Sequence, residues 1–159
     1  MDKPSDQFSK IAYQLAGKRF GIDPINLSEA EHQFDARNIH PKISEISKSL
    51  FDSGHYKQAT FEAYILIENI VKTESSCNNI GFSLMMNVFN ENNPLLCLND
   101  LANDSDKDEQ QGFKHIFAGV VAGIRNPRGH QVDIAETMTE CLDHLSLASL
   151  LIRKIDGAS

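Results

Sequence analysis

Three side chains that suit phosphate chemistry lie close together in the last third of the sequence. Arg125 and Asn126 are adjacent, and His130 follows Arg125 after four intervening residues. The planar guanidinium group of an arginine stays charged and binds two phosphate oxygens at once. A histidine, whose unperturbed pKa is about 6.5, exchanges protons near neutral pH. Together these residues can hold a phosphate and move a proton.

The residues alone also allow a plainer interpretation. Arg125 and His130 can cap the end of a helix by hydrogen bonding to its last carbonyl groups. Arg128, which lies between them, adds a positive charge that suits the binding of a substrate phosphate but equally suits a solvated loop position. We treat Arg125, Asn126 and His130 as candidate catalytic residues and Arg128 as a candidate substrate-binding residue.

A helix that ends in a polar corner is expected to position these residues. Apolar residues recur at helical spacing from Phe113 to Ile124. Pro127, which lacks an N–H group, and Gly129, which tolerates unusual backbone angles, are expected to stop this helix abruptly. Arg125 then lies in the last turn, where free carbonyl groups favour a positive charge.

The rest of the pattern predicts an all-α fold, a helical bundle. Further helices are expected at residues 5–17, 28–37, 41–51, 55–73, 81–90 and 134–155. The helix at 55–73 is apolar on more than one side, which is typical of the central helix of a bundle. Asp133 is expected to cap the last helix, with Glu136 completing the capping pattern. We find no period-two alternation between hairpin turns, so no strand is expected.

The chain is expected to have two parts. Residues 41–159 are expected to form the bundle, and residues 1–40 a short N-terminal helical extension or an arm that packs on a second subunit. Within the bundle, Gly119 and Gly123 have a spacing that allows close helix packing, including packing at a subunit contact. Glu62 and Glu68 lie on the largely apolar helix at 55–73, where either can pair with Arg125 or stay at the rim of the bundle.

Length and charge limit the possible functions. With 159 residues the chain is expected to be one globular domain, and its net charge is −7. Nucleic-acid binders usually carry a basic surface, because most of their affinity comes from neutralising phosphates. The acidity therefore argues against broad coating of RNA, whereas one focused site can work with a few local Arg and Lys residues.

The expected setting is the cytoplasm. The longest apolar run, from Phe117 to Ile124, is far shorter than the ~20 residues of a membrane-spanning helix. The N-terminus does not have a basic stretch followed by an apolar one, so no secretory signal is expected. The three cysteines are few, odd in number and unclustered, which is typical of reduced thiols rather than a disulfide framework.

Neither a metal nor a cofactor is expected. His115 and His144 lie on different helices, and no Cys-x-x-Cys or His-Glu-x-x-His spacing supports a zinc site. His55 precedes the long helix and is expected to cap it or pack against it. No P-loop, dinucleotide fingerprint or Gly-x-Ser-x-Gly elbow is present.

The segment Arg125-Asn126-Pro127-Arg128-Gly129-His130 resembles the Arg–polar–x–x–x–His signature of HEPN domains, small helical proteins many of which are ribonucleases. Residues 50–72 resemble the helix pair that precedes this signature in the Ymh-like branch of the superfamily. The resemblance covers about residues 40–156. It implies that these residues fold as a helical bundle of the HEPN type.

This resemblance implies a metal-independent endoribonuclease in which the 2′-hydroxyl group of RNA attacks the phosphate. Arg125 would stabilise the transition state, His130 would transfer a proton and Asn126 would orient one of them or the substrate. It also implies a homodimer whose two sites face each other in one cleft, and a role in phage defence or a toxin–antitoxin system, with an antitoxin or regulatory protein as a possible partner.

A second hypothesis is a non-catalytic member of the same superfamily. Many HEPN proteins are dimerisation or binding modules, and a fold alone does not confer activity. Such a module would bind a partner protein or a nucleotide, and the acidity of this chain suits a basic partner.

Overall fold

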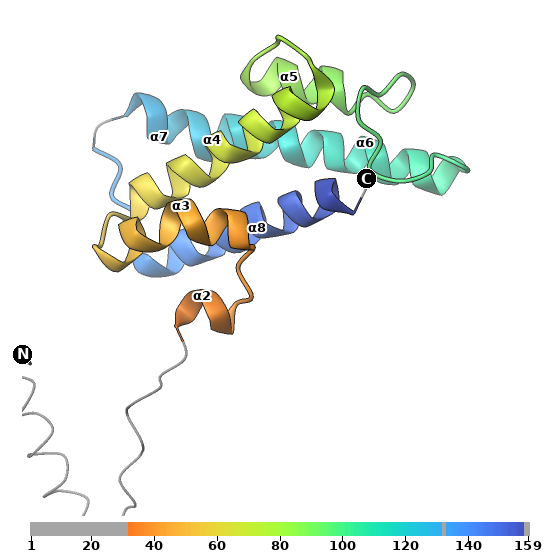
Figure 1. Cartoon of the computed structure of the whole chain (residues 1–159). Helices are drawn as coiled ribbons and strands as arrows, with labels where there is room; N and C mark the ends of the chain where they lie inside the picture. Colours follow the sequence, from red (N-terminus) through yellow and green to blue (C-terminus); the bar gives the residue numbers. More distant parts are fainter. Residues whose placement is uncertain (1–31, 132, 158–159) are drawn as a thin grey trace, which may run out of the picture. The chain divides into compact units, whose positions relative to one another are not determined.

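The computed structural model describes residues 32–131 and 133–157 (Figure 1). All regular structure in these residues is helical, so the all-α prediction is confirmed. A compact unit begins at Phe34. The helix expected at 5–17 and most of the one expected at 28–37 lie outside the described residues.

Helix α4 (Tyr56–Ser75) is the central element of the bundle. It contacts α3 (Pro41–Asp52), α5 (Gly81–Val88), α7 (Asn126–His130) and α8 (Met138–Asp156). Its buried residues lie on more than one side, as the sequence pattern predicted; they are Ala59, Thr60, Ala63, Tyr64, Ile67, Glu68 and Val71. Figure 1 shows α4 running from beside α3 and α8 at its start to α5 at its end.

The segment before α3 packs on the bundle. The short helix α2 (Gln33–Ala36) buries Phe34, whose ring centroid lies 5.1 Å from that of Phe51. The backbone N–H of His40 donates to Ser149 Oγ on α8 at 2.7 Å. The sequence placed the domain boundary near residue 40, whereas these contacts tie residues 34–40 to α3 and α8.

Helix α6 (Asp104–Val120) begins earlier than its apolar pattern suggested. Its N-cap is Asn103, whose side chain accepts a hydrogen bond from the N–H of Asp106. Asp104 and Asp106 lie in the first turn, where the positive end of the helix dipole favours them. Further along, Phe117 stacks on Phe89 with ring centroids 4.4 Å apart and anchors α6 in the core.

The prediction that this helix stops at Pro127 is wrong. The chain passes from α6 through a wide π-helical turn, η2 (Val121–Arg125), directly into α7. The N–H of Asn126 bonds to the carbonyl of Val121, five residues back, instead of four. Pro127 therefore falls in the first turn of a new helical segment, where its missing N–H group costs little.

The last helix also begins differently from the prediction. Its N-cap is Thr137, which forms a reciprocal capping box with Glu140, so Asp133 is not the cap. Glu136 lies just before this cap, and its carboxylate is buried instead of capping the helix. The sequence correctly predicted a capping box at the start of this helix, but its residues are Thr137 and Glu140 and not Asp133 and Glu136.

Gly119 and Gly123 do not pack closely against another helix in the described part of the chain. No heavy atom lies within 4 Å of the position that a Cβ atom would take at either glycine. Ile116 lies on the same helix and is 43% exposed. This face of α6 and η2 is therefore exposed and lined by small and apolar residues.

Two further expectations can be compared with the described residues. The three cysteines are all free thiols, and Cys141 is buried. None of the described helices has the length and apolar character needed to cross a membrane.

Candidate functional site

The three candidate catalytic residues line one cavity. It has a volume of about 640 Å³ and lies where α4, the start of α5 and the junction of η2 with α7 meet. We call it the Arg125 cleft; its lining residues are Ile65, Glu68, Asn69, Lys72, Ile80, Gly81, Phe82, Ser83, Arg125, Asn126 and His130. The structure therefore brings Arg125, Asn126 and His130 together.

The helical geometry explains this arrangement. Asn126 and His130 are four residues apart in α7 and so share one face of the helix. Arg125 is the last residue of η2, and π-helical turns inside helices occur frequently at functional sites. The side chain of His130 makes no hydrogen bond with any described residue, so its ring nitrogens are available to a ligand.

Arg125 is held in place by three contacts. Its Nε atom lies 3.6 Å from Oε2 of the buried Glu68, and its Nη1 atom donates to Asn126 Oδ1 at 2.9 Å. Its guanidinium carbon lies 5.7 Å from the centre of the Phe61 ring. Of the two acidic residues that the sequence left open, Glu68 is the partner of Arg125, whereas Glu62 Oε1 accepts a hydrogen bond from Gln58 Nε2 at 2.6 Å.

This ion pair is incomplete. Neither Arg125 Nε nor Glu68 Oε2 makes a hydrogen bond within the described residues, although both atoms are buried. An arginine has five N–H donors, and only one of them, on Nη1, has a hydrogen-bond partner in the same part of the chain. Arg125 therefore keeps donors with which to bind an anion in the cleft.

Sequence reasoning missed the other polar residues of the cleft. Asn69 and Lys72 line it from α4, and neither makes a side-chain hydrogen bond or ion pair within residues 32–131 and 133–157. Both follow Ile65 at helical spacing, and this stripe on α4 was the available signal. That the stripe faces Arg125 depends on the packing of α7 against α4, which no local pattern reveals.

Arg128 does not line the cleft. Its Nε atom donates to Glu136 Oε2 at 2.6 Å, and its Nη1 atom donates to the carbonyl of Ile124 at 2.9 Å. Its Nη2 atom lies 3.3 Å from His144 Nδ1. The side chain is only 10% exposed, so it is neither a solvated loop residue nor directed at a ligand in the Arg125 cleft. These contacts indicate a structural role.

Glu136 is the centre of this second polar group. Its side chain is 1% exposed, and its Oε1 atom accepts hydrogen bonds from Thr60 and from His144 Nδ1, both at 2.7 Å. Burial acts to raise the pKa of Glu136, but the hydrogen bonds from His144, Arg128 and Thr60 outweigh it and hold the pKa below its usual value. We call Arg128, Glu136, His144 and Thr60 the Glu136 network.

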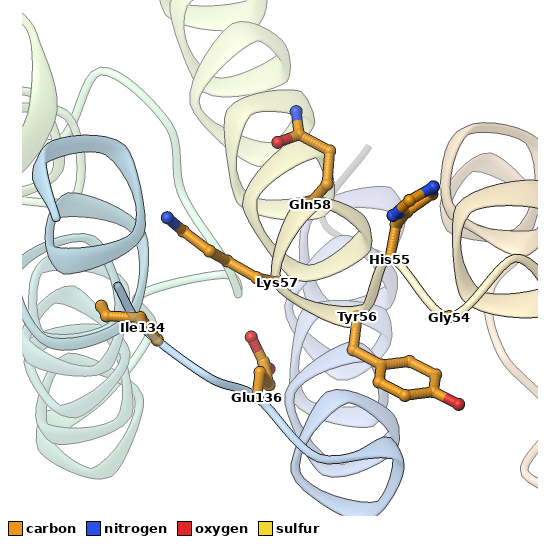
Figure 2. A pocket seen from close by; sticks show the side chains of 7 residues that line it. All are labelled: Gly54, His55, Tyr56, Lys57, Gln58, Ile134 and Glu136. Carbon is orange, nitrogen blue, oxygen red and sulfur yellow. The ribbon is translucent and has the colours of Figure 1, made fainter. Parts of the chain in front are cut away.

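A smaller cavity of about 340 Å³ lies beside this network, at the start of α4 (Figure 2). Its polar groups are committed elsewhere, because the Lys57 ammonium donates to the carbonyl of Gln131 at 2.5 Å and Glu136 is buried in its network. His55 precedes α4 but makes no side-chain cap. Figure 2 shows its ring directed away from the Glu136 carboxylate, so this cavity does not assemble an acid–base pair.

The remaining histidines do not form a metal site with other residues that the structure describes. His144 belongs to the Glu136 network, and His115 is exposed on α6. No group of three or more His, Cys, Asp or Glu side chains in the described ranges is arranged to hold a metal ion.

A comparison with known protein families gives a match over most of the chain. A family model described as "Protein of unknown function (Hypoth_ymh)" matches residues 37–155, which include every residue of the Arg125 cleft and of the Glu136 network. No curated protein and no solved structure matches the chain significantly.

Proposed function

Because this chain belongs to the Hypoth_ymh family, whose function is not known, we propose a function from the cleft itself: a metal-independent endoribonuclease of the HEPN type. The observation that carries the proposal is that Arg125, Asn126 and His130 line one cavity, with an available imidazole and a guanidinium group that keeps donors. These are the groups that phosphodiester cleavage by the 2′-hydroxyl of RNA requires.

Each residue has a distinct part in this reaction. The guanidinium group of Arg125 binds the non-bridging oxygens of the scissile phosphate and stabilises the charge that develops on them. His130 accepts the proton of the 2′-hydroxyl group and returns it to the leaving 5′-oxygen, and Asn126 orients Arg125 through the bond between Nη1 and Oδ1. The new bond joins the 2′-oxygen to phosphorus as the bond to the 5′-oxygen breaks, which leaves a 2′,3′-cyclic phosphate.

The proposal includes a homodimer in which two such clefts face each other. Support comes from the exposed face of α6 and η2, where Gly119 and Gly123 have no neighbour within 4 Å and would let a second helix approach closely. The resemblance to the Ymh-like branch supports a role in phage defence or a toxin–antitoxin pair, with an antitoxin or regulatory protein as a partner.

RNA cleavage by matched variants tests the chemistry. Wild type, Arg125→Ala, His130→Ala and the control His115→Ala, which removes an exposed histidine outside the cleft, are incubated with RNA in excess chelator. Removal of a catalytic proton donor or charge stabiliser is expected to slow cleavage by about 10²–10³-fold, with His115→Ala unchanged. Equal products from all four proteins would eliminate the catalytic pair, and loss of wild-type activity in chelator would indicate a metal enzyme instead.

Sedimentation tests the shared cleft. The purified protein is expected to sediment as a dimer at micromolar concentration. A stable monomer that still cleaves RNA would show that one cleft is sufficient.

The competing proposal is a non-catalytic binding module. It is favoured by the net charge of −7, which suits a basic partner better than RNA. A protein that cleaves no RNA yet binds a basic protein with a dependence on acidic residues would support it.

A further inference from the structure

Two large apolar side chains that line the Arg125 cleft are exposed and are not part of the hydrophobic core. Phe82 is 51% exposed and Ile80 is 68% exposed, and both line the cleft. Single exposed apolar residues are ordinary on protein surfaces. Here, however, an aromatic ring borders a cavity that also contains an arginine and a histidine with unused hydrogen-bonding groups.

The position of Phe82 is fixed by its neighbour. Gly81 adopts a φ of +58°, which a glycine tolerates without strain, and its N–H donates to Glu68 Oε1 at 2.9 Å. The other oxygen of Glu68 faces Arg125. The Glu68 carboxylate therefore contacts both the start of α5 and Arg125. Phe82 follows Gly81 in the first turn of α5 and so lies next to this carboxylate.

The side of the cleft formed by α4 provides uncommitted polar groups. Lys72 carries a positive charge without an ion-pair partner in the part of the chain that the structure describes, and Asn69 presents an amide with both donors and an acceptor. A point charge suits a backbone phosphate, and an amide suits the hydrogen-bonding edge of a base.

We infer that Phe82, Ile80, Asn69 and Lys72 form a nucleotide subsite that holds an unpaired base beside the phosphate bound by Arg125. The base stacks on the Phe82 ring, Asn69 contacts its edge, and Lys72 binds the next phosphate of the strand. This inference rests on the proposed function for the identity of its ligand.

The subsite selects single-stranded RNA. A base in an A-form duplex is stacked between its neighbours and paired, so its face is not accessible to an aromatic ring. An unpaired strand can turn one base onto Phe82 while its phosphate enters the cleft. The protein is therefore expected to prefer loops and single strands to duplexes.

Binding of uncleavable RNA tests the subsite separately from catalysis. Fluorescence anisotropy is measured on the full chain with 2′-O-methyl octanucleotides of A, C or U, which have no free 2′-hydroxyl, and with the same strands in a duplex. Phe82→Ala is expected to weaken binding of the single strands by roughly 5- to 150-fold, and Phe82→Trp to retain it. Leu150→Ala removes an apolar residue of α8 with 53% exposure and is expected to have no effect.

The salt dependence tests Lys72. Each neutralised phosphate of a single strand contributes about −0.7 to the slope of log affinity against log salt concentration. Lys72→Gln is expected to make this slope shallower by about 0.7, whereas Lys107→Gln, an exposed lysine of α6 outside the cleft, leaves it unchanged.

The outcomes separate this inference from the proposed function. Binding that depends on Phe82, without cleavage of any RNA, would support the subsite and remove the ribonuclease. Cleavage and binding by Phe82→Ala at wild-type levels would overturn the subsite and leave the ribonuclease. A Phe82→Ala protein that binds RNA normally but changes its sedimentation would assign this ring to a protein interface, and the subsite would again be wrong.

Discussion

Two arginines three residues apart have opposite environments. Arg125 faces the cleft with a side chain that is 25% exposed, and its Nε atom lies 3.6 Å from a carboxylate without a hydrogen bond. Arg128 is 10% exposed, and its Nε atom donates to Glu136 Oε2 at 2.6 Å. The first has unused donors, whereas the second donates to Glu136 and to the carbonyl of Ile124.

This difference separates a place for binding from a place for stability. A buried charge that is fully hydrogen-bonded stabilises one arrangement of its neighbours, and the loss of its partner is costly. A charge with an incomplete partner contributes less to folding but can still bind something else. The Glu136 network thus links α7 to α4 and α8. Another side of α7 presents Asn126 and His130 to the cleft, next to Arg125 at the end of η2.

The largest effect is expected from the loss of Arg128. Arg128→Ala leaves the Glu136 carboxylate buried without its cation, which is expected to lower the free energy of unfolding by about 3–5 kcal/mol. Arg125→Ala opens the cleft to water around Glu68 and is expected to cost only about 1 kcal/mol. Urea denaturation followed by circular dichroism measures both values. Equal losses for the two variants would remove the distinction between the two sides of α7.

Strong acid is expected to weaken the Glu136 network. Because the pKa of Glu136 is below its usual value in the folded state, its stabilising contribution is present above the unfolded pKa of about 4.3. It is lost as the pH falls through the lower folded pKa. Glu136→Gln is expected to reduce stability at pH 7 by about 2–3 kcal/mol and to flatten the decline below pH 4. Thermal unfolding between pH 3 and pH 7 measures this, and parallel curves for variant and wild type would contradict it.

Glu68→Gln is the matched change on the other side. The amide oxygen can still accept the hydrogen bond from Gly81, and Arg125 can be solvated through the cleft. The free energy of unfolding is therefore expected to change by about 1 kcal/mol or less. A loss as large as that of Glu136→Gln would mean that the pair of Glu68 and Arg125 is as tightly closed as the Glu136 network.

The smallest effect on stability is expected at Gly129. A Cβ atom there would lie 3.0 Å from Cε2 of Phe61, the ring beside Arg125, so Gly129→Ala should displace this ring. The gain in helix propensity offsets this contact, so stability should stay within about 0.5 kcal/mol, while cleavage slows by roughly 3- to 10-fold. Gly112→Ala, at an exposed position of α6 where no atom lies within 4 Å, is the control and should gain up to about 1 kcal/mol.

Most of the fold follows from the periodicity of the sequence. The helices expected at 41–51, 55–73 and 81–90 correspond to α3, α4 and α5 within a few residues, because apolar spacing and Pro41 determine them locally. The continuation through Pro127 was missed, because a wide turn changes the hydrogen-bond register before the proline. That change depends on the tertiary position of α7 against α4.

The site was predictable only where it is local in sequence. Arg125, Asn126 and His130 lie within one hexapeptide, so their residue types were sufficient to select them. Arg128 contacts the Ile124 carbonyl of η2, Glu136 in the segment before α8 and His144 of α8. Its charge is balanced by Glu136, and no pattern around Arg128 in the sequence indicates that this carboxylate is its partner. Lys72 and Phe82 belong to other helices and join the cleft only after folding.

The wide turn η2 determines which arginine is offered to a substrate. An α-helix advances by about 100° per residue, so deleting one residue from this turn would rotate everything after it by that angle. His130 would then point away from the cavity, and Arg128 would lose its hydrogen bond to Glu136. The extra residue in this π-helical turn thus determines which side of α7 faces the cleft.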